Sequence, residues 1–303
     1  MRATAHIAAL HSALWSFDRW YRLSWYVWPI ATAILVCGWI CIDKTPTNSS
    51  GLWARPATSA PAIPVRRSPV LANWPEKLQN DVMVCFSNAV DLSPLIEACT
   101  RLIDSGQAND GQLVSAYSQR GFLQRLSQPD RALDDYNAAL KLQPNSPGTL
   151  TNRAYIYLTR ARNNEAMADL NKAIELFVPA NAALARYYRG FDYLRLKDYD
   201  HAKEDLDEAI KRAPSNPDPY LTRGDVALAQ QQYDAALRDY DEFSKRLPRD
   251  PRGLIGRSSA LDATGRTDEA LAALDKAIAL APNNARALAA RDKLLAKQGD
   301  EKK

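Results

Sequence analysis

Histidine is scarce in this 303-residue chain, which contains only His6, His11 and His201. A catalytic triad or a metal cluster built on imidazole needs such groups close together, and only His201 lies beyond the first 75 residues. A glycine-rich phosphate loop is lacking too, because a GxxG match that ends at Gly256 is weak evidence of one. We therefore expect no enzymatic activity, cofactor, metal ion or small-molecule substrate.

A basic surface for nucleic acid is also lacking. The net charge is +4, but residues 1–75 hold seven Lys and Arg against two Asp and Glu, which leaves 32 against 33 for residues 76–303. Phosphate backbones are bound by lysines and arginines clustered on one face. The near-neutral remainder predicts no nucleic-acid partner.

Cysteine is rare, with four residues and no CxxC pair, so neither zinc binding nor redox catalysis is indicated. Cys85 and Cys99 are the two outside a long apolar stretch, with 13 residues between them. Two reduced core thiols are the alternative, but the topology inferred below places the pair in an oxidising compartment, so we predict a disulfide between Cys85 and Cys99. A disulfide that closes a loop of this size stabilises a fold by about 3 kcal/mol.

Charge is absent from residues 23–42, "LSWYVWPIATAILVCGWICI", which follow an N-terminal segment of residues 1–22. Twenty helical residues extend about 30 Å, the thickness of the hydrocarbon core, and tryptophan and tyrosine gather at the first end of the stretch. A buried globular helix and a cleaved signal peptide are the alternatives. The length, and the lack of a clear A-x-A site, favour an uncleaved transmembrane helix.

Charges beside this stretch predict its orientation. Arg2, Arg19 and Arg22 precede it, whereas Lys44 and Arg55 follow. The positive-inside rule thus favours a cytoplasmic N-terminus. We expect a single-pass inner (plasma) membrane protein with the rest of the chain in the periplasm or otherwise outside the cytoplasm.

Residues 43–75 contain six prolines among Ser, Thr and Ala, which predicts a disordered Pro-rich linker. Folding resumes in residues 76–112, which we interpret as a degenerate N-terminal helical region. There Ser93 and Pro94 predict the start of one helix, and Gly106 predicts its end in a left-handed conformation.

An arginine recurs through the rest of the chain, and a small residue follows the first five of them. The spacings are 33, 36, 34, 34 and 34 residues between Arg120, Arg153, Arg189, Arg223, Arg257 and Arg291. Each unit also carries an alanine at the start of its second half and a proline at its end. A period of this length indicates two helices and two turns per unit, with small residues where the helices cross.

These marks resemble the tetratricopeptide repeat. The family's small eighth residue is matched by Gly121, Ala154, Gly190, Gly224 and Ser258, and its alanine at position twenty by Ala132, Ala166, Ala202, Ala236 and Ala270. Phe243 departs from the small residue of position twenty-seven. The resemblance implies an all-α solenoid of helical hairpins: about five repeats in 113–284, then a capping helix and tail in 285–303. "EACTRLI" ahead of these repeats resembles bacterial membrane-anchored or exported proteins of the family.

Aspartates recur sixteen residues after three of the arginines. We interpret them as structural ion pairs between the two helices of a repeat; a ligand-binding column of arginines is the alternative. The predicted pairs are Arg153 with Asp169, Arg189 with Asp205, and Arg223 with Asp239. Asp239 also lies ahead of Arg257, whose own position sixteen residues on is Ala273. Arg257 is therefore expected either to lack a partner or to pair with Asp239.

The family's concave groove implies a set of partner-binding residues on the first helices: Ser118, Gln119, Phe122, Asn152, Tyr155, Tyr187, Tyr188, Phe191, Arg195, Thr222 and Asp225. Aromatic side chains with polar neighbours suit an extended peptide or a partner helix. The alternative is that several of the rings pack against adjacent repeats. The lysines and asparagines that grip chaperone C-termini in one variety of the family are mostly absent.

We therefore expect a non-enzymatic, membrane-anchored scaffold that binds a peptide or protein outside the cytoplasm. A fixed subunit of an envelope assembly or secretion complex is an alternative. An adaptor that faces the cytoplasm is a third interpretation.

Overall fold

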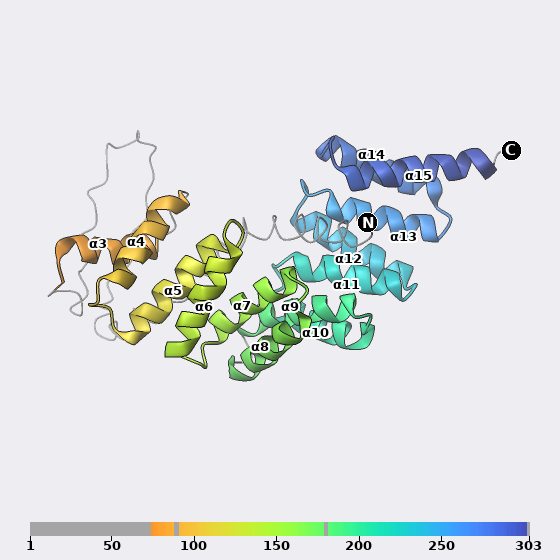
Figure 1. Ribbon diagram of the computed structural model, residues 1–303. Helices are drawn as coiled ribbons and strands as arrows, with labels where there is room; N and C mark the ends of the chain where they lie inside the picture. The colour runs from red at the N-terminus through yellow and green to blue at the C-terminus, as the bar shows by residue number, and fades with distance from the viewer. Residues whose placement is uncertain (1–73, 88–90, 179–180, 302–303) are drawn as a thin grey trace, which may run out of the picture. The chain divides into compact units, whose positions relative to one another are not determined.

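The computed structural model describes residues 74–87, 91–178 and 181–301. These residues form thirteen helices and no strand (Figure 1). They fall into two compact units, which meet within one helix between Arg120 and Gly121. Each unit is described by itself.

The first unit contains α3 (Glu76–Cys85), α4 (Leu92–Asp104) and most of α5 (Asp110–Gln124). The sequence predicted a single helix before residue 106, so α3 is an addition. The predicted start of α4 was also wrong, because its N-cap is Asp91, whose carboxylate accepts the Ser93 N–H at 3.1 Å. Gly106 is left-handed as predicted, with φ +64°.

The second unit is a run of helical hairpins that follow one another in chain order (Figure 1). After the end of α5 come α6 (Pro129–Leu142), α7 (Pro147–Thr159), α8 (Asn163–Leu176), α9 (Ala183–Arg195), α10 (Tyr199–Arg212), α11 (Asp218–Ala229), α12 (Tyr233–Arg246), α13 (Arg252–Ala263), α14 (Thr267–Leu280) and α15 (Ala285–Glu301). The predicted pairs of helices and the lone final helix are confirmed.

Small residues let the two helices of each hairpin approach closely. The alanines that open the second helices are fully buried, and so is the large residue four positions further on, such as Tyr240. A Cβ added to Gly224 would come within 2.8 Å of the Tyr240 ring. Because buried side chains are close-packed, the glycine is what admits the ring.

Phe243 replaces the small residue of its position without loss of packing. Its ring is fully buried, and a Cβ on Gly253 of the next first helix would lie 2.8 Å from it. The departure in one repeat is thus accommodated by a glycine in the next.

The first helices α7, α9, α11, α13 and α15 pack on one another in sequence, whereas the second helices pack mainly on first helices. Closer spacing on one side of a stack bends it toward that side. The first helices therefore line the concave side of this unit.

The predicted transmembrane helix (23–42), the segment before it (1–22) and the linker (43–75, apart from its last two residues) lie outside the described residues. Within residues 74–87, 91–178 and 181–301, no helix combines the length and the apolar character that a membrane span requires.

Candidate partner-binding surface

Arginines at the seventh position of the first helices form what we call the seam, together with the acidic and amide side chains that they contact. Three of these guanidinium groups donate two hydrogen bonds to the aspartate sixteen residues later: 2.8 and 2.8 Å for Arg153–Asp169, 2.6 and 2.8 Å for Arg189–Asp205, and 2.8 and 2.7 Å for Arg223–Asp239. All three aspartates are buried. The hydrogen bonds that Arg223 donates to Asp239 raise the pKa of the guanidinium, which stays charged.

The same arginines also reach the preceding repeat. The distances are 2.8 Å for Arg153–Asn137, 2.7 Å for Arg189–Asn171, 2.6 Å for Arg223–Asp207, 3.0 Å for Arg257–Asp241 and 2.7 Å for Arg291–Asp275. The expectation for Arg257 was therefore wrong in both forms, because its partner is Asp241. The seam thus joins neighbouring hairpins, and in the three repeats with Asp169, Asp205 and Asp239 it also joins the two helices of a hairpin.

The side chains that the sequence assigned to the groove divide by exposure. Tyr155, Tyr187 and Tyr188 are only 4%, 6% and 6% exposed. The ring of Tyr188 lies 5.6 Å from that of Tyr155 on α7 and 5.4 Å from that of Tyr187, centroid to centroid. These rings fill the contact between first helices, so they offer little surface to a partner. Asn152 and Thr222 are likewise buried.

Other candidates remain partly exposed: Phe122, Phe191, Arg195 and Asp225 in the second unit, and Ser118 and Gln119 on the α5 residues of the first unit. Beside Phe122 lies Arg125, which the sequence analysis did not select. Its guanidinium carbon is 3.6 Å from the centre of the Phe122 ring and 5.9 Å from that of Tyr155. One end of the concave side is thus aromatic and cationic.

Three further residues that lie on the first helices or contact their side chains were missed by the sequence analysis. Asp218 and Arg252 occupy the same repeat position on α11 and α13, and they form an ion pair at 3.1 Å. Burial raises the pKa of Asp218 to about 6, against the opposing effect of Arg252. Tyr240, from α12, donates a hydrogen bond to Asp225 at 2.8 Å. The signal available for the first two was their separation of one repeat.

Asp192 on α9 is fully buried, and neither of its oxygens has a hydrogen-bond partner among the described residues. The nearest cation is Arg195, 3.6 Å away. Burial raises the pKa of this carboxyl. Four other repeats carry an apolar residue at the same position, such as Ile156 and Val226. Asp192 is therefore a polar residue in an apolar core position.

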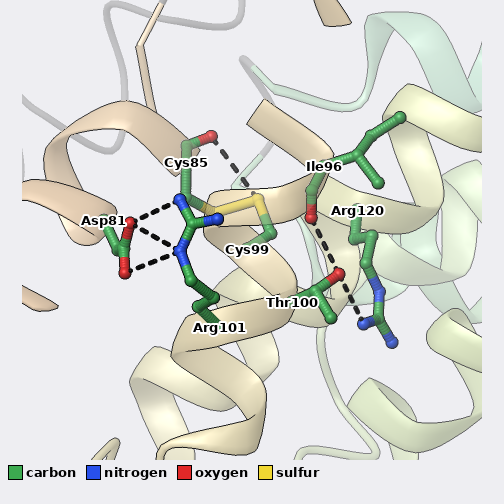
Figure 2. Close-up of a disulfide and its surroundings, with 7 residues drawn as sticks. All are labelled: Asp81, Cys85, Ile96, Cys99, Thr100, Arg101 and Arg120. Atoms are coloured by element: carbon green, nitrogen blue, oxygen red, sulfur yellow. Dashed lines mark hydrogen bonds and ion pairs between the residues drawn. A yellow bond between two sulfur atoms is a disulfide. The ribbon is translucent and has the colours of Figure 1, made fainter. Parts of the chain in front are cut away.

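In the first unit, the structure brings Cys85 and Cys99 to bonding distance, with their Cα atoms 4.8 Å apart (Figure 2). One turn away on the same two helices, the Arg101 guanidinium contacts buried Asp81 at 2.7 Å. Figure 2 shows both links between α3 and α4 side by side. In the described residues no group of His, Cys, Asp and Glu side chains is arranged to hold a metal ion.

Stacked hairpins with a concave row of first helices define a class of protein, the helical-repeat solenoids. Models of the tetratricopeptide repeat match residues 123–180 and 221–285, and residues 183–216. These matches cover more than half of the chain, and the protein belongs to the tetratricopeptide repeat family. Proteins of this family are scaffolds for protein–protein interaction.

Curated relatives match only part of this chain. Human tetratricopeptide repeat protein 13 is 33% identical over 109 residues, which cover 36% of this chain and 12% of that protein. The E3 ubiquitin-protein ligase CHIP of Arabidopsis thaliana is 33% identical over 91 residues, or 30% of this chain and 32% of the ligase. The chain thus spans no more than about a third of either relative.

Solved structures confirm the fold. A tetratricopeptide repeat protein from Parabacteroides merdae superposes with a TM-score of 0.59 at 22% identity, over 75% of this chain and 89% of that one. PilW, a widely conserved type IV pilus biogenesis factor, gives 0.61 at 15% identity, over 71% and 98% of the two chains. At these identities the likeness concerns the all-α solenoid alone.

Proposed function

We propose that this protein is a membrane-anchored scaffold whose repeat array captures a segment of a partner protein outside the cytoplasm. One observation carries the proposal: packing leaves side chains of three different first helices partly exposed on the concave side. They are Phe122, Phe191 and Asp225, all at the ninth position of their repeats. We call these three residues the groove row.

The groove row has the character of a recognition surface. Rings that keep exposed area can be buried by a partner at small entropic cost, and a carboxylate among them selects what binds. An extended segment, or one face of a helix, suits a surface made of parallel helices. The seam arginines, in contrast, are already occupied by partners within the fold.

Two features support the proposed location. The 20 uncharged residues 23–42 are long enough to cross a bilayer once. Cys85 and Cys99 lie at bonding distance, and such pairs persist in oxidising compartments and are rare in the reducing cytosol. The location itself is tested by a reporter fused after Lys303. An extracytoplasmic reporter should be active there, and activity of a cytoplasmic reporter instead would invert the topology.

Site-specific photo-crosslinking in intact cells tests the binding proposal. A photoreactive amino acid replaces Phe191 in the groove row, and in a matched control it replaces Arg238, which is exposed on the second helix α12. We expect a discrete crosslinked partner from position 191 and none from position 238, identified by mass spectrometry. A single partner in near-stoichiometric yield indicates a fixed subunit of a larger complex. Equal crosslinking from both positions contradicts a groove-specific function.

A further inference from the structure

Asp225 is the one acidic member of the groove row. Its carboxylate oxygen Oδ1 accepts a hydrogen bond of 2.8 Å from the hydroxyl of Tyr240, a fully buried residue of α12. Asp225 is itself partly exposed. Because this hydrogen bond fixes the position of Oδ1, it also fixes the orientation of the second carboxylate oxygen. The Asp225 side chain is therefore held in one orientation.

The other acidic side chains on this side of the first helices have cationic partners. Asp218 contacts Arg252 at 3.1 Å, and Asp262 contacts Lys297 at 2.9 Å. Among the described residues, Asp225 has no ion-pair partner and only the Tyr240 hydroxyl as a hydrogen-bond donor. It is therefore a carboxylate on this surface that no cationic side chain among the described residues contacts directly.

The burial of Asp225 makes the missing cationic contact energetically unfavourable for its charged form. Burial raises the pKa of Asp225, and the opposing effects of the Tyr240 hydrogen bond and of the more distant Arg286 and Arg252 do not offset it. A carboxylate in this condition gains most from direct contact with a cation, since that contact replaces the lost hydration.

We propose that the segment bound in the groove carries a lysine or arginine side chain that pairs with Asp225 and lies beside Phe191. The inference rests on the proposed function and specifies the chemistry of the partner. Phe191 and Asp225 share the ninth position of neighbouring repeats, on α9 and α11, which pack directly on each other. Packed helices lie about 8–10 Å apart, so one long side chain can meet both the ring and the carboxylate.

Selection from a phage-displayed library of random dodecapeptides tests this proposal. The full chain, kept in mild detergent because of residues 23–42, is compared with the variants Asp225→Asn and Asp262→Asn. The asparagine at 225 still accepts the Tyr240 hydroxyl, so it removes charge and little else. Asp262→Asn is the matched control, because it removes a carboxylate that Lys297 already pairs with. Photoreactive versions of the selected peptides locate their contacts by mass spectrometry.

Peptides selected on the wild type and on Asp262→Asn, and crosslinked to α9 or α11, should share a lysine or arginine. Replacing that residue by norleucine should weaken wild-type binding about tenfold and leave Asp225→Asn binding unchanged. Peptides that crosslink to α9 or α11 without a shared basic residue, or with one insensitive to Asp225→Asn, overturn the proposal and leave the scaffold function intact. If no selected peptide crosslinks to the first helices, the proposed function fails and this inference fails with it.

Discussion

The seam and the groove row occupy the same first helices but obey different rules. The seventh position is arginine in every first helix from α7 to α15, and each of these arginines contacts an acidic or amide side chain of the preceding repeat. The ninth position is phenylalanine, tyrosine, phenylalanine, aspartate and serine from α5 to α13. The uniform arginine of the seventh position makes a packing contact that every repeat needs. The varied residues of the ninth position are suited instead to contact with a partner molecule.

This difference separates two kinds of substitution. Changes that remove a favourable contact in the seam or in the core should lower the free energy of unfolding, and changes in the groove row should lower affinity for a partner. The experiments below start with the largest expected effect on stability.

The largest expected effect on stability concerns Asp192, which occupies a core position that is apolar in the other repeats. Asp192→Leu removes a buried carboxylate without hydrogen bonds and should stabilise the protein by about 1–3 kcal/mol. Val226→Asp places the same group at the same position of the next repeat and should cost roughly 3–5 kcal/mol. Denaturant unfolding measures both. A stability loss on Asp192→Leu would show that the carboxylate has a partner beyond the described contacts.

The α3–α4 hairpin lacks the seam and is held instead by the Cys85–Cys99 link and the Asp81–Arg101 pair. Replacing both cysteines by serine should destabilise this hairpin by about 3 kcal/mol. Hydrogen exchange should then speed up in α3 and α4 and stay unchanged in α11 and α12. Quantitative thiol labelling of the unreduced, denatured wild type would instead show that no disulfide forms.

Double-mutant cycles separate strong from weak contacts within the seam. Arg223 with Asp239 should couple by about 1–2 kcal/mol, because Asp239 is buried and bound through two hydrogen bonds. Arg257 with Asp241 should couple by less than about 0.5 kcal/mol, because the Asp241 side chain is 60% exposed. Coupling of Arg257 with Asp239 would contradict the pairing scheme.

The last prediction concerns the pH dependence of stability that Asp218 contributes. Burial raises the pKa of Asp218 to about 6, whereas an unfolded aspartate titrates near 3.9. The folded state thus binds the proton more tightly, so this group adds stability as pH falls through 6. Between pH 7 and pH 5 the wild type should gain about 1 kcal/mol relative to Asp218→Asn. Denaturation at both pH values measures this difference, and exposed Asp234→Asn serves as the control. Equal pH dependence of the wild type and Asp218→Asn would refute it.

Much of the fold was predictable from the sequence, because proline and small residues recur with the period of the hairpin. Helix α3 was not predicted from the sequence. Its N-cap residue is Pro75, which gives no side-chain cap, and its apolar residues do not form a clear face. The partner of Arg257 escaped for a different reason. Asp239 was the candidate considered ahead of Arg257, whereas Asp207, Asp241 and Asp275 each stand sixteen residues before a seam arginine.

The candidate site was only partly predictable. Tyr188 and Phe191 are both aromatic and lie within one turn of α9, so sequence reasoning treated them alike. Their exposure differs because Tyr188 meets Tyr155 and Tyr187, and Tyr155 comes from another repeat. Such contacts depend on how hairpins stack, which no single repeat encodes.

The most direct test of the account compares Phe191→Ala in the groove row with Arg223→Ala in the seam, measured against the partner that crosslinks to position 191. Phe191→Ala should keep the wild-type Tm within a few degrees. It should weaken binding by about 2 kcal/mol, which raises the Kd roughly thirtyfold. Arg223→Ala should lower the Tm and bind normally at temperatures where it remains folded. Unchanged affinity in Phe191→Ala, or lost affinity in folded Arg223→Ala, would contradict the division of the first helices into a structural and a binding face.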